Sequence, residues 1–361
     1  MPHLTYHIFR RPLRRVLIQK KGVALLMVIW ILMLLTVIVT EFCYTMRSQT
    51  NITRNLKEST QAYYVAQAGI NRAIAAVIKD HMAQGRIQRA DDAFADEESV
   101  KWQMNMDLPP MPFAQGSYQI RIQNESGRID INQAGPKLLG AVLDNFDLDE
   151  EQKNIIIDSI MDWRDTNNLH RPNGAEDDYY QSLDPPYNAK DGDFDTVHEL
   201  LRVKGMSPGL FYNGLDKLLT VLPVSKKGLR GSGKKRDDHD FDRININAAS
   251  VEMLARLPGM TPELAEAVQS FRKENGSLSR SQLSKILGSD VYKKVSRYIS
   301  LDSLSYYTIS SVGRLNGSQT RKGVEAMILL DPDAEKRYRI ISWHDGIRES
   351  TGALLLSGAI K

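Results

Sequence analysis

Cysteine is almost absent from this sequence: Cys43 is the only one among 361 residues, so no disulfide can form within the chain. Recognisable catalytic patterns are absent too. The seven histidines are scattered without an H-E-x-x-H pair, and no serine or cysteine stands in a nucleophile motif. We therefore expect that the protein is not an enzyme.

Negative charge is missing from the first 22 residues, which contain the basic residues Arg10, Arg11, Arg14, Arg15, Lys20 and Lys21. Charge of either sign is then missing from Val23 to Thr40. As a helix this apolar run would measure about 27 Å, close to the ~30 Å hydrocarbon core of a bilayer. Basic residues beside a span stay on the cytoplasmic side. The sequence predicts a single membrane span with a cytoplasmic N-terminus.

Small residues are missing where an ordinary signal peptide would be cleaved, because the apolar run is followed by Glu41 and a phenylalanine. The one small residue at a plausible cleavage position is Gly22, between a basic doublet and the apolar run. This arrangement resembles a type IV prepilin signal, which implies cleavage by prepilin peptidase between Gly22 and Val23, with the helix retained. The glutamate usual at the fifth mature position is absent, since Met27 stands there. A plain single-span anchor is the alternative.

Proline is absent from Gln61 to Ile78, and helical spacing of apolar residues continues past Thr40. These residues are Ile52, Leu56, Tyr63, Ala66, Ile70, Ile74 and Val77. The pattern predicts one helix of roughly 85 Å, with residues 23–40 in the membrane and residues 41–79 extending into a head domain. An anchor followed by a separate juxtamembrane helix is the alternative.

Strand-like alternation brackets a long helical stretch. Strands are predicted at Val100–Met106, 116–123, 306–312, 323–330 and 338–343, and helical periodicity covers the residues between them. We expect a pilin-like domain in two parts, residues 80–130 and 301–361, with a helical domain at 131–300 inserted between them. The region from Lys226 to Arg243 is rich in glycine and charge and is expected to form an exposed loop.

The insert contains an internal repeat. An I-N-x-A-x-x-x-L pattern occurs at Ile131 and again at Ile246. In each copy we expect the asparagine, Asn132 or Asn247, to cap the helix that follows.

The second copy continues as Leu257-Pro258-Gly259-Met260-Thr261, which resembles the hairpin of a helix-hairpin-helix module. In that module, backbone N–H groups hold a DNA phosphate. Here Thr261 replaces the second glycine and Pro262-Glu263 follow, which removes one amide and adds a carboxylate. Without the leader's six basic residues, 41 basic and 44 acidic residues remain. We expect the hairpin to serve packing and to bind no nucleic acid.

Five carboxylates are concentrated in two neighbouring segments, I-M-D-W-R-D and G-A-E-D-D-Y-Y: Asp162, Asp165, Glu176, Asp177 and Asp178. Hard oxygen donors of this kind suit calcium, although the spacing is not that of an EF-hand. A solvated acidic loop is the alternative. A further acidic segment, Asp191 to Asp195, could form a second site or a turn.

These segments, the prepilin-like signal and the missing glutamate at Met27 together resemble the K-type minor pseudopilins of type II secretion systems. The resemblance implies calcium at Asp162, Asp165, Glu176, Asp177 and Asp178. It also implies an α+β fold, in which a long N-terminal helix packs on an antiparallel sheet interrupted by a large all-α insert of helix-hairpin-helix or SAM-like type.

The same resemblance implies a bacterial inner-membrane protein with a periplasmic C-terminal domain, located at the tip of the pseudopilus, where it initiates assembly and supports protein export. Its implied partners are the I-type and J-type minor pseudopilins, prepilin peptidase and the inner membrane, with secreted substrates and the outer-membrane secretin as further candidates. Two alternatives remain, a membrane-tethered DNA receptor for uptake and a minor type IV pilin.

Overall fold

The structure is a computed structural model that describes residues 21–85, 107–223 and 239–347, without the side chains of residues 21–22 and 82–85. The predicted leader, apart from its last two residues, and the predicted strand Val100–Met106 lie outside the described residues, as does most of the predicted loop from Lys226 to Arg243. The chain forms two compact units, Met1–Glu58 and Ser59–Lys361.

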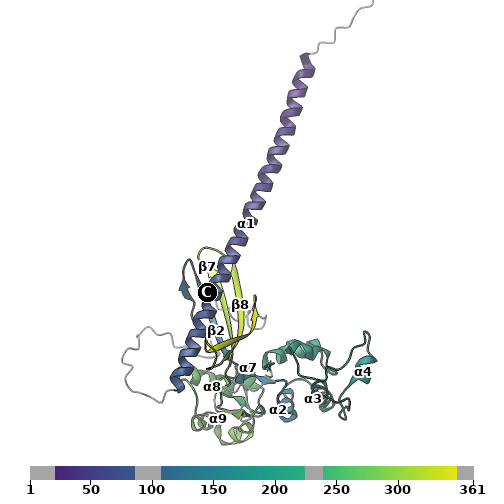
Figure 1. The fold of residues 1–361 in the computed structure, drawn as a ribbon, viewed down its shortest axis with the longest axis vertical. Helices are drawn as coiled ribbons and strands as arrows, with labels where there is room; N and C mark the ends of the chain where they lie inside the picture. Colours follow the sequence, from purple (N-terminus) through teal and green to yellow (C-terminus); the bar gives the residue numbers. More distant parts are fainter. Residues whose placement is uncertain (1–20, 86–106, 224–238, 348–361) are drawn as a thin grey trace, which may run out of the picture. The chain divides into compact units, whose positions relative to one another are not determined.

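The N-terminal helix α1 covers Lys21–Gly85 without a break (Figure 1). The long helix predicted from the sequence is confirmed, and a separate juxtamembrane helix is ruled out. In the first unit the apolar side chains from Val23 to Val39 are exposed, and α1 is the only described helix that is long and apolar enough to cross a membrane. In the second unit α1 instead buries an apolar stripe, formed by Val65, Ala66, Ile70, Ala73, Ile74 and Val77.

That stripe packs on an antiparallel five-stranded sheet of order β1-β2-β7-β8-β9. The strands are β1 (Met111–Phe113), β2 (Gly116–Asn124), β7 (Tyr306–Leu315), β8 (Arg321–Leu330) and β9 (Tyr338–His344). The four strands predicted within the described residues are all present. Strand β2 pairs directly with β7 although the helical insert separates them in sequence, so the predicted interruption of the sheet is confirmed.

Glycine allows α1 to approach the sheet closely. A Cβ at Gly313 of β7 would collide with backbone atoms of Ala62 and Ala66 in α1. The sheet face toward α1 carries Ile120, Ile309 and Ala326, all fully buried in one core cluster. Helix and sheet are therefore in direct backbone contact at this point.

The insert contains two successive sets of elements, seen in Figure 1 as a teal group and a green group of helices. The first set is η1 (Glu125–Gly127), β3 (Ile129–Asp130), α2 (Pro136–Leu143), α3 (Glu150–Arg164), α4 (Asp177–Gln181), η2 (Val197–Arg202), α5 (Pro208–Leu210), η3 (Phe211–Leu215), α6 (Asp216–Leu218) and β4 (Leu219–Thr220). The second set is β5 (Ile244–Asn245), α7 (Val251–Ala255), α8 (Pro262–Asn275), α9 (Arg280–Val295) and β6 (Ile299–Ser300). The helical insert thus also contains two short parallel strand pairs, β3 with β4 and β5 with β6.

The sequence repeat corresponds to a structural repeat. Asn132 exchanges two hydrogen bonds with the backbone of Phe194, and Asn247 does the same with Leu278. The predicted role of these asparagines as helix caps is wrong, because α2 and α7 begin after Gly135 and Ser250. Each asparagine instead fixes the loop before the later helix of its own repeat, so its amide satisfies buried backbone groups that are distant in sequence.

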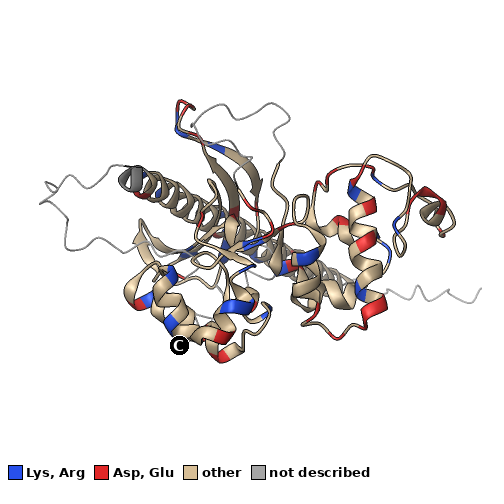
Figure 2. Ribbon diagram, turned by 90° about the horizontal axis from the view of Figure 1, so that it is seen from below, with Lys and Arg blue, Asp and Glu red and all other residues tan. Residues whose placement is uncertain are grey.

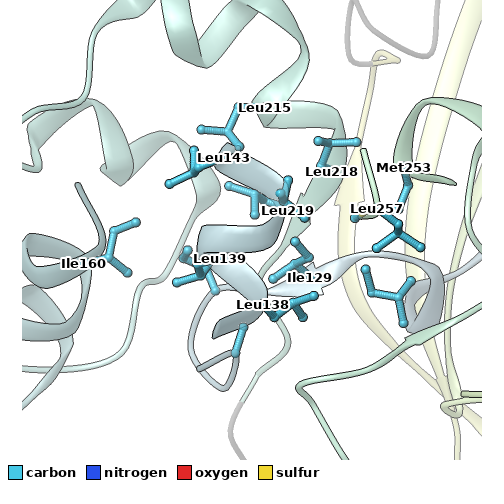
Figure 3. Close-up of a cluster of buried hydrophobic side chains, with 14 of the residues drawn as sticks. Ile129, Leu138, Leu139, Leu143, Ile160, Leu215, Leu218, Leu219, Met253 and Leu257 are labelled. Carbon is cyan, nitrogen blue, oxygen red and sulfur yellow. The ribbon is translucent and has the colours of Figure 1, made fainter. Parts of the chain in front are cut away.

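A half-buried arginine is also repeated. Arg164, the last residue of α3, donates to the carbonyls of Ile131 and Ala134, and Arg272 of α8 donates to those of Ile246 and Ala249. Side chains of both repeats belong to one hydrophobic core. Figure 3 shows part of it, with Leu138 of the first repeat and Leu257 of the second. The two repeats therefore form a single folded body.

Candidate metal centre

The acidic segments meet at the C-terminal end of α3. A capping box at Asp149 starts this helix, and its last turn contains Asp162, which is fully buried. Asp165 is the C-cap residue of α3, and Glu176 is the N-cap residue of the short helix α4. The loop between these helices brings the two segments together.

Asp162, Asp165 and Glu176 each offer a carboxylate oxygen, and these oxygens lie within 4.8 Å of one another. Glu176 is only 1% exposed, and neither of its oxygens has a hydrogen-bond partner. A buried carboxylate without a partner is costly unless a proton or a cation compensates it. This group of hard oxygen donors fits the coordination that calcium prefers.

The raised pKa values of the group also indicate that it needs positive charge. The pKa of Glu176 is raised to about 7, first by burial and then by the charges of the neighbouring carboxylates Asp162, Asp165, Asp191 and Asp177. Burial and the charges of Asp177 and Asp165 also raise the pKa of Asp191. Five carboxylates therefore repel one another here, and Figure 2 shows acidic residues gathered at α4 and its loops.

One guanidinium group offsets part of this negative charge. Arg171 donates from its side chain to Asp162 and, at 2.8 Å, to Asp165, and its backbone N–H donates to Asp162 at 3.0 Å. No guanidinium bond reaches the oxygens of Glu176. Arg171 could not be predicted as part of this group from the sequence, because nothing in the linear pattern placed it against the aspartates.

The loop that contains Arg171 is fixed at several points. Asn173 donates to Asp158 through its backbone and its side chain, and Lys204 donates to the carbonyl of Gly174 at 2.9 Å. Gly174 must lack a side chain, because a Cβ there would collide with the carboxylate of Asp162. These contacts hold the loop, and with it the three carboxylates, in place.

The other predicted site residues lie as follows. Asp177 is close enough to affect the pKa of Glu176, and one of its oxygens accepts from the N–H of Ala189 at 2.9 Å. Asp178 is exposed and accepts from the N–H of Tyr179, outside the group of three. Asp191, predicted as part of a second site or a turn, lies close enough to Glu176 to raise its pKa. Val23 and Met27 are exposed on α1.

The two helical hairpins are joined to each other by hydrogen bonds. Asn145, after α2, donates to the carbonyl of Arg256, after α7, and Arg256 donates back to the carbonyl of Asn145. The guanidinium group of Arg256 also lies 4.2 Å from the ring centroid of Phe146. The first hairpin carries Asp144, Asp147 and Asp149. Its charge and the internal use of Arg256 both disfavour phosphate binding.

Comparisons with known proteins match the two sets of elements in the insert separately. Residues 120–224 match the family model described as type II secretion system protein K, and residues 239–299 match the helix-hairpin-helix motif. A putative type II secretion system protein K from Escherichia coli K12 is 27% identical over 58% of this chain and 64% of its own length. The type II secretion system protein K of Pseudomonas aeruginosa PAO1 is 25% identical over 74% of this chain and 77% of its own length.

The chain therefore spans a little under two thirds of the Escherichia coli relative. Among solved structures, it is similar to a chain in the GspK-GspI-GspJ complex of enterotoxigenic Escherichia coli, with a TM-score of 0.49 and 17% identity over 84% of this chain and 99% of that one.

A long apolar N-terminal helix that packs on an antiparallel sheet, with a helical insert between the strands, defines a pilin-like protein. The matches then indicate which kind. The chain is similar to the type II secretion system protein K family, in agreement with the resemblance seen in the sequence.

Proposed function

We propose that this protein is a minor pseudopilin of a type II secretion system. The observation that carries the proposal is the combination in one chain of the helix α1, exposed and apolar at its start and packed on a sheet at its end, with an insert that matches the protein K family. The first part provides a membrane-bound assembly helix, and the second distinguishes the subunit from ordinary pilins.

The N-terminal sequence sets the membrane orientation and the processing of the subunit. The basic leader keeps residues 1–22 in the cytoplasm, the remaining chain lies in the periplasm, and prepilin peptidase cleaves between Gly22 and Val23. The subunit then joins the I-type and J-type minor pseudopilins through α1. Met27 fits a position at the tip of the pseudopilus, because a tip subunit has no neighbour above it whose N-terminal amine needs a carboxylate. There it initiates assembly and supports export, facing secreted substrates and the outer-membrane secretin.

Calcium is the second part of the proposal. Asp162, Asp165 and Glu176 would hold the ion, with Asp177 and Asp191 close by. The donors are carboxylates only, and the orphaned oxygens of Glu176 mark where positive charge is needed. A bound calcium ion would cross-link the end of α3 to α4 and so stiffen the insert.

Co-purification tests the assembly. The mature chain is expressed with the I-type and J-type minor pseudopilins, and the complex is isolated with calcium or with EGTA. We expect a stable complex in calcium. A chain that stays monomeric with both partners under both conditions would contradict the pseudopilin function.

Calcium binding is tested separately by titrating the chelator-treated protein. We expect tight binding that is lost in Asp162→Asn. Glu252→Gln, a change in a first-turn residue of α7, is the control and should bind normally. Unchanged binding in Asp162→Asn would exclude this site without affecting the assembly proposal.

The DNA-receptor alternative makes a different prediction, namely salt-sensitive binding of duplex DNA by the hairpin at Gly259. Glu263 lies in the first turn of α8, beside that hairpin. We expect no such binding, and a gel-shift assay with the purified chain measures it.

A further inference from the structure

Arg171 binds two of the carboxylates that form the candidate calcium site. One nitrogen of its guanidinium group, Nη1, donates to Oδ1 of Asp162 and, at 2.8 Å, to Oδ2 of Asp165. A calcium ion lies about 2.3–2.6 Å from each oxygen that coordinates it. An ion coordinated by both of these oxygens would therefore lie no more than a few ångströms from Nη1, where two positive charges repel each other strongly.

The other oxygen of each aspartate is already used by the loop after α3. The backbone N–H of Arg171 lies nearer to Oδ2 of Asp162, at 3.0 Å, than to Oδ1, at 3.3 Å. Oδ1 of Asp165 accepts from Asn167 twice, from its backbone N–H at 3.1 Å and from its side-chain amide at 2.6 Å. The oxygens that the guanidinium group holds are therefore the ones most open to a cation.

The third carboxylate shows that Arg171 is an incomplete counter-ion. Glu176 is buried and neither of its oxygens has a hydrogen-bond partner, although the three carboxylates approach within 4.8 Å of one another. Arg171 supplies one positive charge to this group and bonds to only two of its members. A divalent cation supplies two charges and can be coordinated by all three carboxylates.

The side chain of Arg171 can leave this group more easily than the carboxylates can. It is 40% exposed, whereas the side chain of Asp162 is fully buried. An arginine side chain is long, and its charged end is stable in water. The backbone N–H of Arg171 would still donate to Asp162 after the side chain had moved, so the loop would keep this anchor.

We propose that Arg171 determines the calcium affinity of this site as an internal competitor of the ion. In the absence of calcium, its guanidinium group holds Asp162 and Asp165 together and lets the insert fold. When calcium binds, the guanidinium group releases both aspartates and moves into solvent. Arg171 thereby sets the calcium concentration at which the site fills. This inference rests on the proposed calcium site and adds that one of the chain's own cations regulates it.

Calcium titration of the full chain in detergent, after treatment with chelator, tests the competition. We expect Arg171→Gln to bind calcium at least about tenfold more tightly than the unmodified chain, because no guanidinium group then has to be displaced. Lys190→Gln is the control for the loss of positive charge alone. Lys190 lies in the same acidic region, but its ion pairs are with Asp195 and Glu199. Its loss should tighten binding by less than about threefold.

A second measurement needs no variant and so does not depend on the folding of Arg171→Gln. Phenylglyoxal modifies accessible arginine side chains, and mass spectrometry of peptides locates the modified residues. In the unmodified chain Arg171 should react at least about fivefold faster in calcium than in EGTA, because calcium shifts the population toward the released side chain. Arg280, at an exposed position in α9, is the internal control and should react equally in both.

The outcomes separate this competition from the calcium site itself. Unchanged or weaker binding in Arg171→Gln, with binding by the unmodified chain still lost in Asp162→Asn, would overturn the competition and leave the site standing. Equal reactivity of Arg171 in calcium and in EGTA would overturn it as well. Binding by neither the unmodified chain nor Arg171→Gln would instead overturn the calcium site, and the competition with it.

Discussion

At the scale of single residues, Gly174 and Asp162 show how tightly the metal centre is fitted. A Cβ at position 174 would overlap the buried carboxylate of Asp162. We expect Gly174→Ala to destabilise the protein by about 1–3 kcal/mol, the usual cost of overpacking, and to weaken calcium binding at least about tenfold. Thermal unfolding and calcium titration measure the two effects.

Gly192→Ala is the matched control for this substitution. Gly192 lies in the same acidic region, but the atom nearest to a Cβ there, apart from its chain neighbours, would be the carbonyl oxygen of Lys190 at 3.9 Å. It should bind calcium as the unmodified chain does. Equal loss in both variants would mean that glycine flexibility matters here, and not the fit against Asp162.

Glu176 predicts a pH dependence. Its pKa rises from 4.5 in the unfolded chain to about 7 in the fold, so between these pH values the folded state binds more protons. Without calcium, the free energy of unfolding should therefore fall as the pH rises from 4.5 to 7, by an amount of the order of 3 kcal/mol. Urea unfolding in EGTA at pH 5 and pH 7.5 measures this.

Glu176→Gln provides the comparison for the pH effect. Its neutral amide cannot titrate, so most of the pH dependence should disappear. Part should remain, because the pKa of Asp191 is raised in the same direction. A glutamine variant with the full pH dependence would show that Glu176 is not the group responsible.

At the scale of elements, the repeated arginines hold each helical repeat together. Burial lowers the pKa of Arg272 to about 10, and its guanidinium group donates to two carbonyls of the loop before α7. Arg272→Leu should cost about 2–4 kcal/mol because it leaves these acceptors unpaired. Chemical denaturation measures the loss. Arg280→Leu, at an exposed position in α9, should change stability by less than about 0.5 kcal/mol.

The contact between α1 and the sheet depends on Gly313. Because a Cβ there would meet the backbone of α1, Gly313→Ala must push the helix away from β7. We expect a loss of about 2–4 kcal/mol, more than typical side-chain overpacking, since backbone atoms cannot rotate aside. Gly346→Ala, where nothing lies within 4 Å of the added Cβ, is the control. Equal thermal stability of the two variants would contradict this packing.

At the scale of the molecule, the insert and the pilin-like part have separate main hydrophobic cores, with a small cluster of Leu222, Tyr306 and Leu329 between them. Calcium removal should therefore loosen the insert around the metal centre more than the sheet. We expect EGTA to raise hydrogen exchange in residues 162–191 at least about fivefold and to leave β7 and β8 unchanged. Uniform loosening of both parts would mean that the centre stabilises the whole unit. No change anywhere would argue against a structural ion.

The parts of this protein that could be predicted from the sequence are those whose physical signal is local. The charge-free run after Gly22, the proline-free helix that becomes α1, the alternation of four strands, and the carboxylate-rich segments at Asp162 and Glu176 could all be recognised along the chain, because periodicity and charge are properties of neighbouring residues.

Which distant groups meet depends on the three-dimensional packing of the chain. It placed Arg171 on Asp162, gave Asn132 and Asn247 their bonds to Phe194 and Leu278 instead of helix ends, and brought Asp191 beside the site while leaving Asp178 outside it. The physical reason is that a buried polar group takes whichever partner the packed core brings within reach, and that partner is not encoded in local spacing.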